Sequence, residues 1–245
     1  MNKSATIKRI HLLTKIFGIL KENVLRGDYM SIEKQNYIDF LIDVAFVGDV
    51  VGDTSDISKG YKKAINNAYR DLQRTISYKK LGKSADEVAA FKNDCREIIG
   101  SALDELLEIN ALDKSLFDKW HEKLYFELKE QNIKLTSGQI QKWVNMTLKN
   151  LCVLEEFNYD GLNGFQDKAR FFHIPIDTYV MEIEKKEKLL DISIEKRIRN
   201  SNGGKSSSWS KWDNYDLYKE IQEDFRENLS HTTPFEWELT SWKRK

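Results

Sequence analysis

The side chains that could carry chemistry lie between Leu135 and Val180, a stretch that reads LTSGQIQKWVNMTLKNL, then a polar connector, then HIPIDTYV. Lys142 carries an amine, which becomes a nucleophile when it is desolvated enough to lose its proton. Asp177 carries a carboxylate, which can act as a fixed negative charge or as a base. These two groups are the strongest candidates for a reactive pair in the chain.

Local signals predict that a helix positions each of these residues. Thr136 and Gln139 have the spacing of a capping box, in which a hydroxyl and a side-chain amide satisfy backbone N–H groups at a helix start. The apolar positions that follow recur every three or four residues and predict one buried face, with Lys142 off that face. Pro175 keeps the residue before it extended. Asp177 is then predicted to cap the next helix.

At these residues the sequence resembles the helix-hairpin-helix DNA glycosylases. That family has a hairpin of the form Leu-Pro-Gly-x-Gly-x-Lys before a helix, and later an extended Pro/Ala-Val-Asp-Thr segment whose aspartate begins another helix. Here GQIQKWVNMTL corresponds to the hairpin and helix, with Gly138 at the first glycine and Lys142 at the lysine of lyase-competent members. IPIDTYV corresponds to the second segment, with Asp177 at the catalytic aspartate. Residues 132–137 would form the hairpin.

The resemblance implies an enzyme that excises a damaged or modified base from double-stranded DNA by cleaving the N-glycosidic bond. Because the sugar becomes oxocarbenium-like, Asp177 would supply negative charge beside C1′ or deprotonate the nucleophile. Lys142 would attack that carbon and form a Schiff base, which adds lyase activity. If Lys142 stays charged, Asp177 would instead activate water. Either route requires the nucleotide to be flipped out of the stack into a pocket.

The expected DNA contacts lie around the hairpin and in a basic segment, residues 185–211, which contains eight basic and three acidic residues. The sequence SNGGKSSS within it predicts a flexible loop. Trp209 and Trp212 end this segment and would stack on an extruded base. The residues predicted to contact the DNA are Gly138, Gln139, Gln141, Lys205 and Lys211. The residues predicted to line the base pocket are Trp143, His173, Trp209 and Trp212.

Composition limits the functions that fit. The 39 basic and 39 acidic residues balance, so the net charge does not favour nucleic acid, whose binding depends on phosphate neutralisation. The two cysteines are far apart, which indicates a reducing, cytoplasmic setting and excludes the four-cysteine iron–sulfur cluster of some glycosylases. The four histidines lack ligand spacing, so we predict no metal and no cofactor.

The apolar periodicity predicts an all-α, multi-helix protein. We expect a single domain, residues 1–245, built as a glycosylase-like bundle of two packed lobes. Residues 1–110 would form the N-terminal lobe, and residues 111–245 the lobe with the hairpin and the aromatic C-terminal section. Helices are expected at residues 10–24, after Ser31 and Ser84, after either Asp113 or Ser115, through the apolar face that begins at Tyr61, and at residues 213–230. The only candidate strand is the short ISI run at residues 192–194.

Two other stretches have ordinary interpretations. The apolar run IHLLTKIFGIL is interrupted by Lys15 and is not predicted to be a signal peptide, and no run is long enough to span a membrane. Asp49, Asp53 and Asp56 lack the spacing of a calcium-binding loop, so a turn is expected there.

The same residues also fit two other functions. A non-catalytic nucleic-acid-binding module would keep the hairpin and use Asp177 only as a helix cap, with Lys142 on the surface. A helical protein-interaction protein would bind no nucleic acid, and the neutral net charge favours it. The sequence does not identify the excised base, the oligomeric state, or whether the DNA attacked belongs to the cell or to an invader.

Overall fold

The computed structural model describes residues 38, 41–42, 45–46 and 57–241, and the chain divides into two compact units, residues 1–47 and 48–245. In the first unit, Ile38, Leu41 and Ala45 are helical, as predicted for the helix after Ser31. The helix expected at residues 10–24 and the turn expected at Asp49, Asp53 and Asp56 lie outside the described residues. Residues on both sides of position 110 belong to the second unit.

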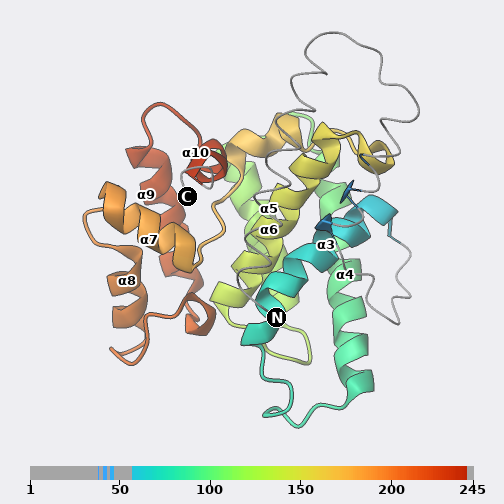
Figure 1. Cartoon of the computed structure of the whole chain (residues 1–245), viewed down its shortest axis with the longest axis horizontal. Coiled ribbons are helices and arrows are strands. Elements are labelled where there is room, and N and C mark those ends of the chain that lie inside the picture. The colour runs from blue at the N-terminus through green and yellow to red at the C-terminus, as the bar shows by residue number, and fades with distance from the viewer. Residues whose placement is uncertain (1–37, 39–40, 43–44, 47–56, 242–245) are drawn as a thin grey trace. The chain divides into compact units, whose positions relative to one another are not determined.

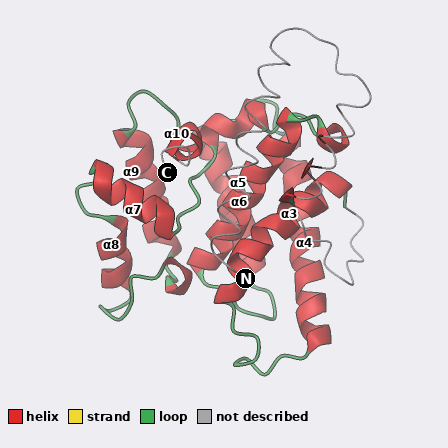
Figure 2. Cartoon of the chain, viewed as in Figure 1, coloured by secondary structure: helices red, strands yellow, loops and turns green. Residues whose placement is uncertain are grey.

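The second unit is built from helices, which confirms the all-α class (Figures 1 and 2). The α-helices are α3 (Lys59–Leu72), α4 (Ala85–Glu108), α5 (Lys114–Lys129), α6 (Ser137–Glu156), α7 (Thr178–Glu187), α8 (Ile194–Ser201), α9 (Tyr215–Asn228) and α10 (Pro234–Ser241). Four 3-10 turns join them: η1 (Gln73–Thr75), η2 (Tyr159–Gly161), η3 (Gln166–Phe171) and η4 (Trp209–Lys211). The described residues contain no strand. No helix among them is long and apolar enough to cross a bilayer.

The caps that start α4, α5 and α6 are among those that the sequence predicts. Ser84 with Glu87, and Thr136 with Gln139, form complete capping boxes at α4 and α6. The Asp113 side chain accepts from the Leu116 amide at the start of α5. The strand proposed at residues 192–194 was wrong, because the Ser193 hydroxyl accepts from the Lys196 amide and caps α8. An N-cap hydroxyl gives the backbone a helical start that three β-prone residues do not outweigh.

Helix α6 is the central element, with α3 packed antiparallel along it. The Trp143 indole donates to the Ile65 carbonyl at 3.1 Å, and Asn150 donates to the Ala64 carbonyl at 3.1 Å. Nearly all of α6 is buried, including Lys142, which is 4% exposed. The prediction that Lys142 lies off the buried face was therefore wrong about its environment. Helix periodicity identifies the most apolar face, but here neighbouring segments also cover the polar ones.

The basic segment contains a helix followed by a loop. Helix α8 occupies residues 194–201, and its Arg197 pairs with Glu220 and Asp224 of α9. Residues 202–208, in the Gly/Ser run predicted as a loop, are not helical. Helix α9 covers residues 215–228, close to the predicted 213–230. Its aromatic face is buried, as expected, and the ring centroid of Phe225 lies 5.3 Å from that of Trp237 of α10.

Candidate functional site

The two residues singled out by the sequence meet in space. Lys142 of α6 donates to Asp177 with an Nζ–Oδ2 distance of 2.6 Å, and their side chains are only 6% and 16% exposed. The other carboxylate oxygen, Oδ1, accepts from the Val180 amide at 3.0 Å and caps α7, as predicted. Asp177 therefore uses one oxygen to begin a helix and the other to hold a buried ammonium group.

A third ionisable group, Asp71, lies on α3 at the same height along the α3–α6 contact as Lys142. Along the antiparallel α3–α6 contact, Asn67 donates to Asn150 at 3.3 Å, while Gln139 donates to Thr75 through bonds of 3.1 and 3.2 Å. In the sequence, Asp71 lies midway between Asn67 and Thr75. Lys142 likewise lies between Gln139 and Asn150, the partners of those two residues on α6. The sequence analysis did not identify Asp71. The available signal was weak: it is the only acidic residue in the strongly basic α3.

The protein shifts the pKa values of the two carboxyl groups in opposite directions. Burial raises the pKa of Asp71, and the positive charges of Lys142 and Arg70 offset this only in part. Burial acts on Asp177 in the same way, but the charge and hydrogen bond of Lys142 outweigh it, and the pKa of Asp177 is lowered. Asp177 is therefore the fixed anion of the site, and Asp71 is the group better suited to accept and return a proton.

A second buried ion pair lies two turns further along α6. Lys149 contacts both carboxylate oxygens of Glu238 at 2.7 and 2.6 Å, with side chains 13% and 3% exposed. Burial lowers the pKa of Lys149, and the Glu238 charge partly offsets that effect. Lys142 and Asp177 also act on the Lys149 pKa, so the two pairs form one electrostatic cluster.

The extended segment that delivers Asp177 is held by side-chain amides. Ile174 and Ile176 flank Pro175 and are fully buried, so their backbone N–H and C=O groups need hydrogen-bond partners within the protein. Gln141 accepts from the Ile176 amide at 2.9 Å and donates to the Ile176 carbonyl at 2.7 Å. Gln222 binds both backbone groups of Ile174 in the same way, at 3.0 and 2.8 Å. Gln141 lies next to Lys142 on α6, so these bonds fix Asp177 relative to Lys142.

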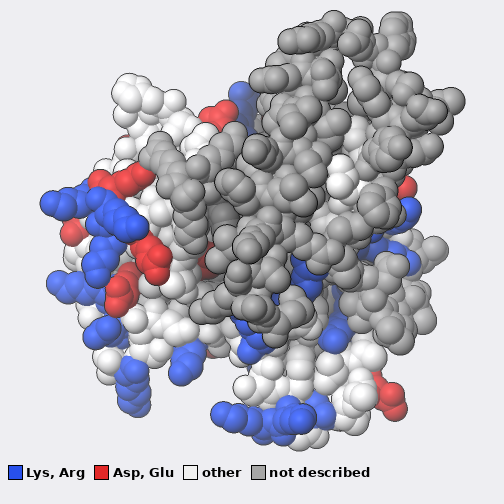
Figure 3. Space-filling model, in the orientation of Figure 1, with Lys and Arg blue, Asp and Glu red and all other residues white. Residues whose placement is uncertain are grey.

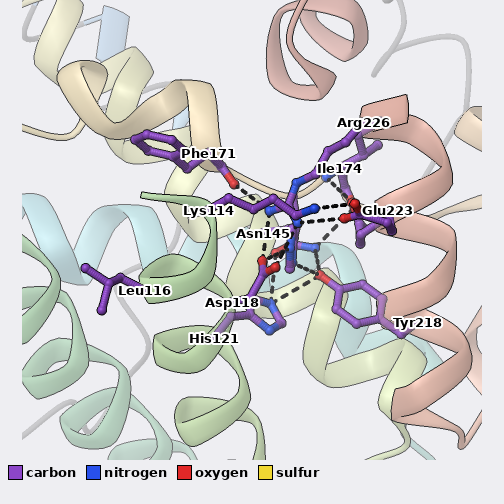
Figure 4. A network of polar contacts seen from close by, with 12 residues as sticks. Lys114, Leu116, Asp118, His121, Asn145, Phe171, Ile174, Tyr218, Glu223 and Arg226 are labelled. Atoms are coloured by element: carbon purple, nitrogen blue, oxygen red, sulfur yellow. Dashed lines mark hydrogen bonds and ion pairs between the residues drawn. The ribbon is translucent and has the colours of Figure 1, made fainter. Parts of the chain in front are cut away.

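A buried polar network supports this segment from the other side (Figure 4). His173 contacts Asp118 through Nε2 at 2.9 Å and the Tyr218 hydroxyl through Nδ1 at 2.8 Å. Arg226 donates to both Asp118 oxygens at 2.8 and 2.9 Å. His121 contacts the hydroxyls of Tyr218 and Tyr215, while Asn145 donates to Tyr218 and to the Ile174 carbonyl.

One assignment of protons satisfies this network with both histidines neutral. His173 donates from Nε2 to Asp118 and accepts the Tyr218 hydroxyl proton at Nδ1. His121 then donates from Nε2 and accepts from Tyr215. Burial lowers the pKa of His173 to about 4, although the bond to Asp118 opposes it, and burial also lowers the pKa of His121.

The Trp209–Trp212 turn covers the N-terminus of α6. The Gly138 amide donates to the Trp212 carbonyl at 2.9 Å, and a Cβ at Gly138 would lie 1.7 Å from the Trp209 carbonyl oxygen. The Ser137 amide donates to Asp213 at 3.0 Å. A glycine is therefore needed at position 138 for the close approach of this turn.

The other predicted site residues have separate environments. Trp143, Trp212 and His173 are 0%, 0% and 3% exposed, and Trp209 is 8% exposed. Gln139 and Gln141 bind neighbouring segments, as described above. Lys205 and Lys211 are exposed. The structure thus brings Lys142, Gln141 and Asp177 together, and it gives the four aromatic residues proposed for the base pocket buried packing positions.

No protein-family model, curated protein or solved structure matches this chain. The resemblance to the glycosylases therefore stays a prediction from the sequence at Gly138, Lys142 and Asp177. Within the residues that the structure describes, no cluster of three or more His, Cys, Asp or Glu side chains is arranged to hold a metal ion. Cys95 and Cys152 are buried free thiols.

Proposed function

We propose that this protein is a DNA glycosylase-like enzyme that excises a damaged or modified base. The observation that carries the proposal is the buried contact between Lys142 and Asp177, 2.6 Å long. These are the two positions at which the sequence resembles the family's lysine and aspartate. A buried ion pair adds little net stability, because desolvation offsets most of the Coulombic attraction.

Lys142, Asp71 and Asp177 can each take one role in the reaction. Lys142 must first lose a proton, and Asp71 is the carboxylate suited to accept it because its pKa is raised. The neutral amine then forms a bond to C1′ while the C1′–base bond breaks and its electron pair leaves with the base. The protonated Asp71 returns a proton to the departing base. Asp177 stays ionised and stabilises the positive charge that develops on the sugar.

The test uses duplex DNAs that contain oxidised, alkylated, deaminated or phage-type modified bases, with released base measured by mass spectrometry. Asp177→Asn is the matched variant, because asparagine keeps an oxygen that can cap α7 while removing the charge. We expect release by the wild type and a loss of about a hundredfold or more in the variant. Circular dichroism must show that the variant is folded.

Borohydride capture tests the nucleophile separately. Reduction of the Schiff base should link the wild type covalently to the DNA, whereas Lys142→Met should bind DNA without being captured. Base release without any capture would assign the reaction to water activated by Asp177. Capture of the Lys142→Met variant would show that another residue is the nucleophile.

One observation favours a second candidate, a non-catalytic nucleic-acid-binding module. Asp177 already has a structural role, because its carboxylate caps α7. In that case Lys142 and Asp177 only stabilise the fold. DNA binding that persists in Asp177→Asn, without base release by the wild type from any DNA of the panel, would support this second candidate.

A further inference from the structure

The connection between α3 and α4 is strongly basic. Residues 70–83 contain five basic residues and one acidic residue, Asp71, in a chain with no net charge. We refer to residues 74–83 as the basic turn. In Figure 3, Lys and Arg side chains gather at the lower edge, where Figure 1 places this connection, whereas basic and acidic side chains are mixed over α7 and α8.

The charges of the basic turn are exposed and largely uncompensated. Arg74, Lys79 and Lys80 are exposed, and none of them takes part in an ion pair among the described residues. Several basic residues of α7 and α8 are paired instead: Lys185 and Arg199 both pair with Glu195. Uncompensated cations on one small surface attract an anionic partner and release its counterions on binding.

The basic turn also has a defined conformation. Backbone bonds join Lys80 and Leu81 to Ser77, and Gly82 to Lys79. Gly82 has φ +66°, a backbone conformation that glycine adopts without strain. The Tyr78 hydroxyl, 2.6 Å from that of Tyr69, ties the turn to α3. A rigid turn loses little conformational entropy when it binds.

The turn is attached to the candidate site itself. Gln139, one helical turn before Lys142, donates to both the carbonyl and the hydroxyl of Thr75. Arg74 is close enough to Asp71 for its charge to lower the carboxyl pKa, against the larger effect of burial. A polyanion bound along the basic turn would therefore lie beside Asp71 and Lys142.

We propose that the basic turn binds the phosphate backbone of the DNA strand whose nucleotide enters the site. This inference rests on the proposed function, and it adds a binding surface outside the hairpin and the segment 185–211. Phosphate groups fit the surface because Arg74, Lys79 and Lys80 are exposed cations.

The test compares two charge-matched double variants of the full chain. Lys79→Gln/Lys80→Gln removes two charges from the basic turn, while Lys119→Gln/Arg170→Gln removes two exposed basic charges that have no ion-pair partner among the described residues. Arg74 is left intact because it acts on Asp71. Affinity for a fluorescent duplex is measured by anisotropy over a range of salt concentrations.

We expect the first variant to bind more weakly and its slope of log affinity against log salt to fall by about 1.8, or 0.9 for each phosphate that a lysine no longer neutralises. The control variant should keep the wild-type slope. Equal slopes in all three proteins, equally weakened binding in both variants, or no binding of DNA by the wild type would overturn the inference. Base release is assayed separately and tests the chemistry. Release with unchanged slopes would support the proposed function but not DNA binding by the basic turn. Altered slopes without release would support DNA binding by the basic turn but not catalysis.

Discussion

Acidification should destabilise this protein because the fold keeps His173 neutral. The side chain is 3% exposed and lies between Asp118 and the Tyr218 hydroxyl. Arg226, His121 and Glu223 are the other ionisable groups that act on it or contact it. A second proton on the ring would meet the hydroxyl that now donates to Nδ1, and it would place a second cation beside Arg226.

The size of the effect follows from the pKa difference. The pKa of His173 falls from 6.5 to about 4 on folding, chiefly because of burial. A depressed pKa means that the stabilisation is complete above 6.5 and is lost as the pH falls towards 4. The loss approaches ~1.4 kcal/mol per pH unit in that window, which gives about 2 kcal/mol between pH 7 and pH 5. His121 contributes in the same direction.

Urea unfolding followed by circular dichroism at pH 7 and pH 5 measures this loss. The variant His173→Gln does not titrate, so the wild type should lose about 2 kcal/mol more stability than the variant over this interval. The substitution His231→Gln, at an exposed position, should retain the wild-type pH dependence. Parallel curves for the wild type and His173→Gln would refute the claim that the fold holds this ring neutral.

Three further predictions concern the packing around the site. Gly138→Ala should destabilise the protein by about 3 kcal/mol, measured by urea unfolding, because the new Cβ would meet the Trp209 carbonyl; wild-type stability would show that the turn can move away. Tyr218→Phe should lower the free energy of unfolding by about 2 kcal/mol, since the buried partners of the hydroxyl are left unsatisfied. Asp177→Asn should lower it by about 3 kcal/mol, and Lys142→Met/Asp177→Asn should regain most of that loss, because only the single variant leaves a buried charge unpaired.

The helix starts could be predicted from the sequence because a cap is decided within four residues. Ser84 with Glu87, and Thr136 with Gln139, need no distant partner to form a capping box. The cap that Asp177 forms is also decided within four residues. The wrong strand prediction at residues 192–194 also concerns a local signal. It used the two isoleucines and overlooked the Ser193 hydroxyl, which caps a helix.

The site itself depends on contacts that local patterns do not encode. Lys142 is buried because segments distant in sequence cover the polar side of α6. Asp71 lies beside Lys142 because of the register between α3 and α6. The hydrogen bonds Asn67–Asn150 and Gln139–Thr75 fix that register. The two histidines lack metal-ligand spacing, and their shared partner Tyr218 lies 97 residues from His121. A single sequence specifies none of these pairings.

The double role of Asp177 bears on whether the ion pair is structural or chemical. A cap needs only one acceptor oxygen, and asparagine or serine supplies it without a charge. A buried ion pair is often replaceable by apolar side chains without loss of stability. Neither role therefore explains why both charges are present next to Asp71, a carboxyl group whose pKa is raised. If Lys142→Met/Asp177→Asn is as stable as the wild type yet releases no base, folding does not require the pair, and catalysis remains the reason for burying it.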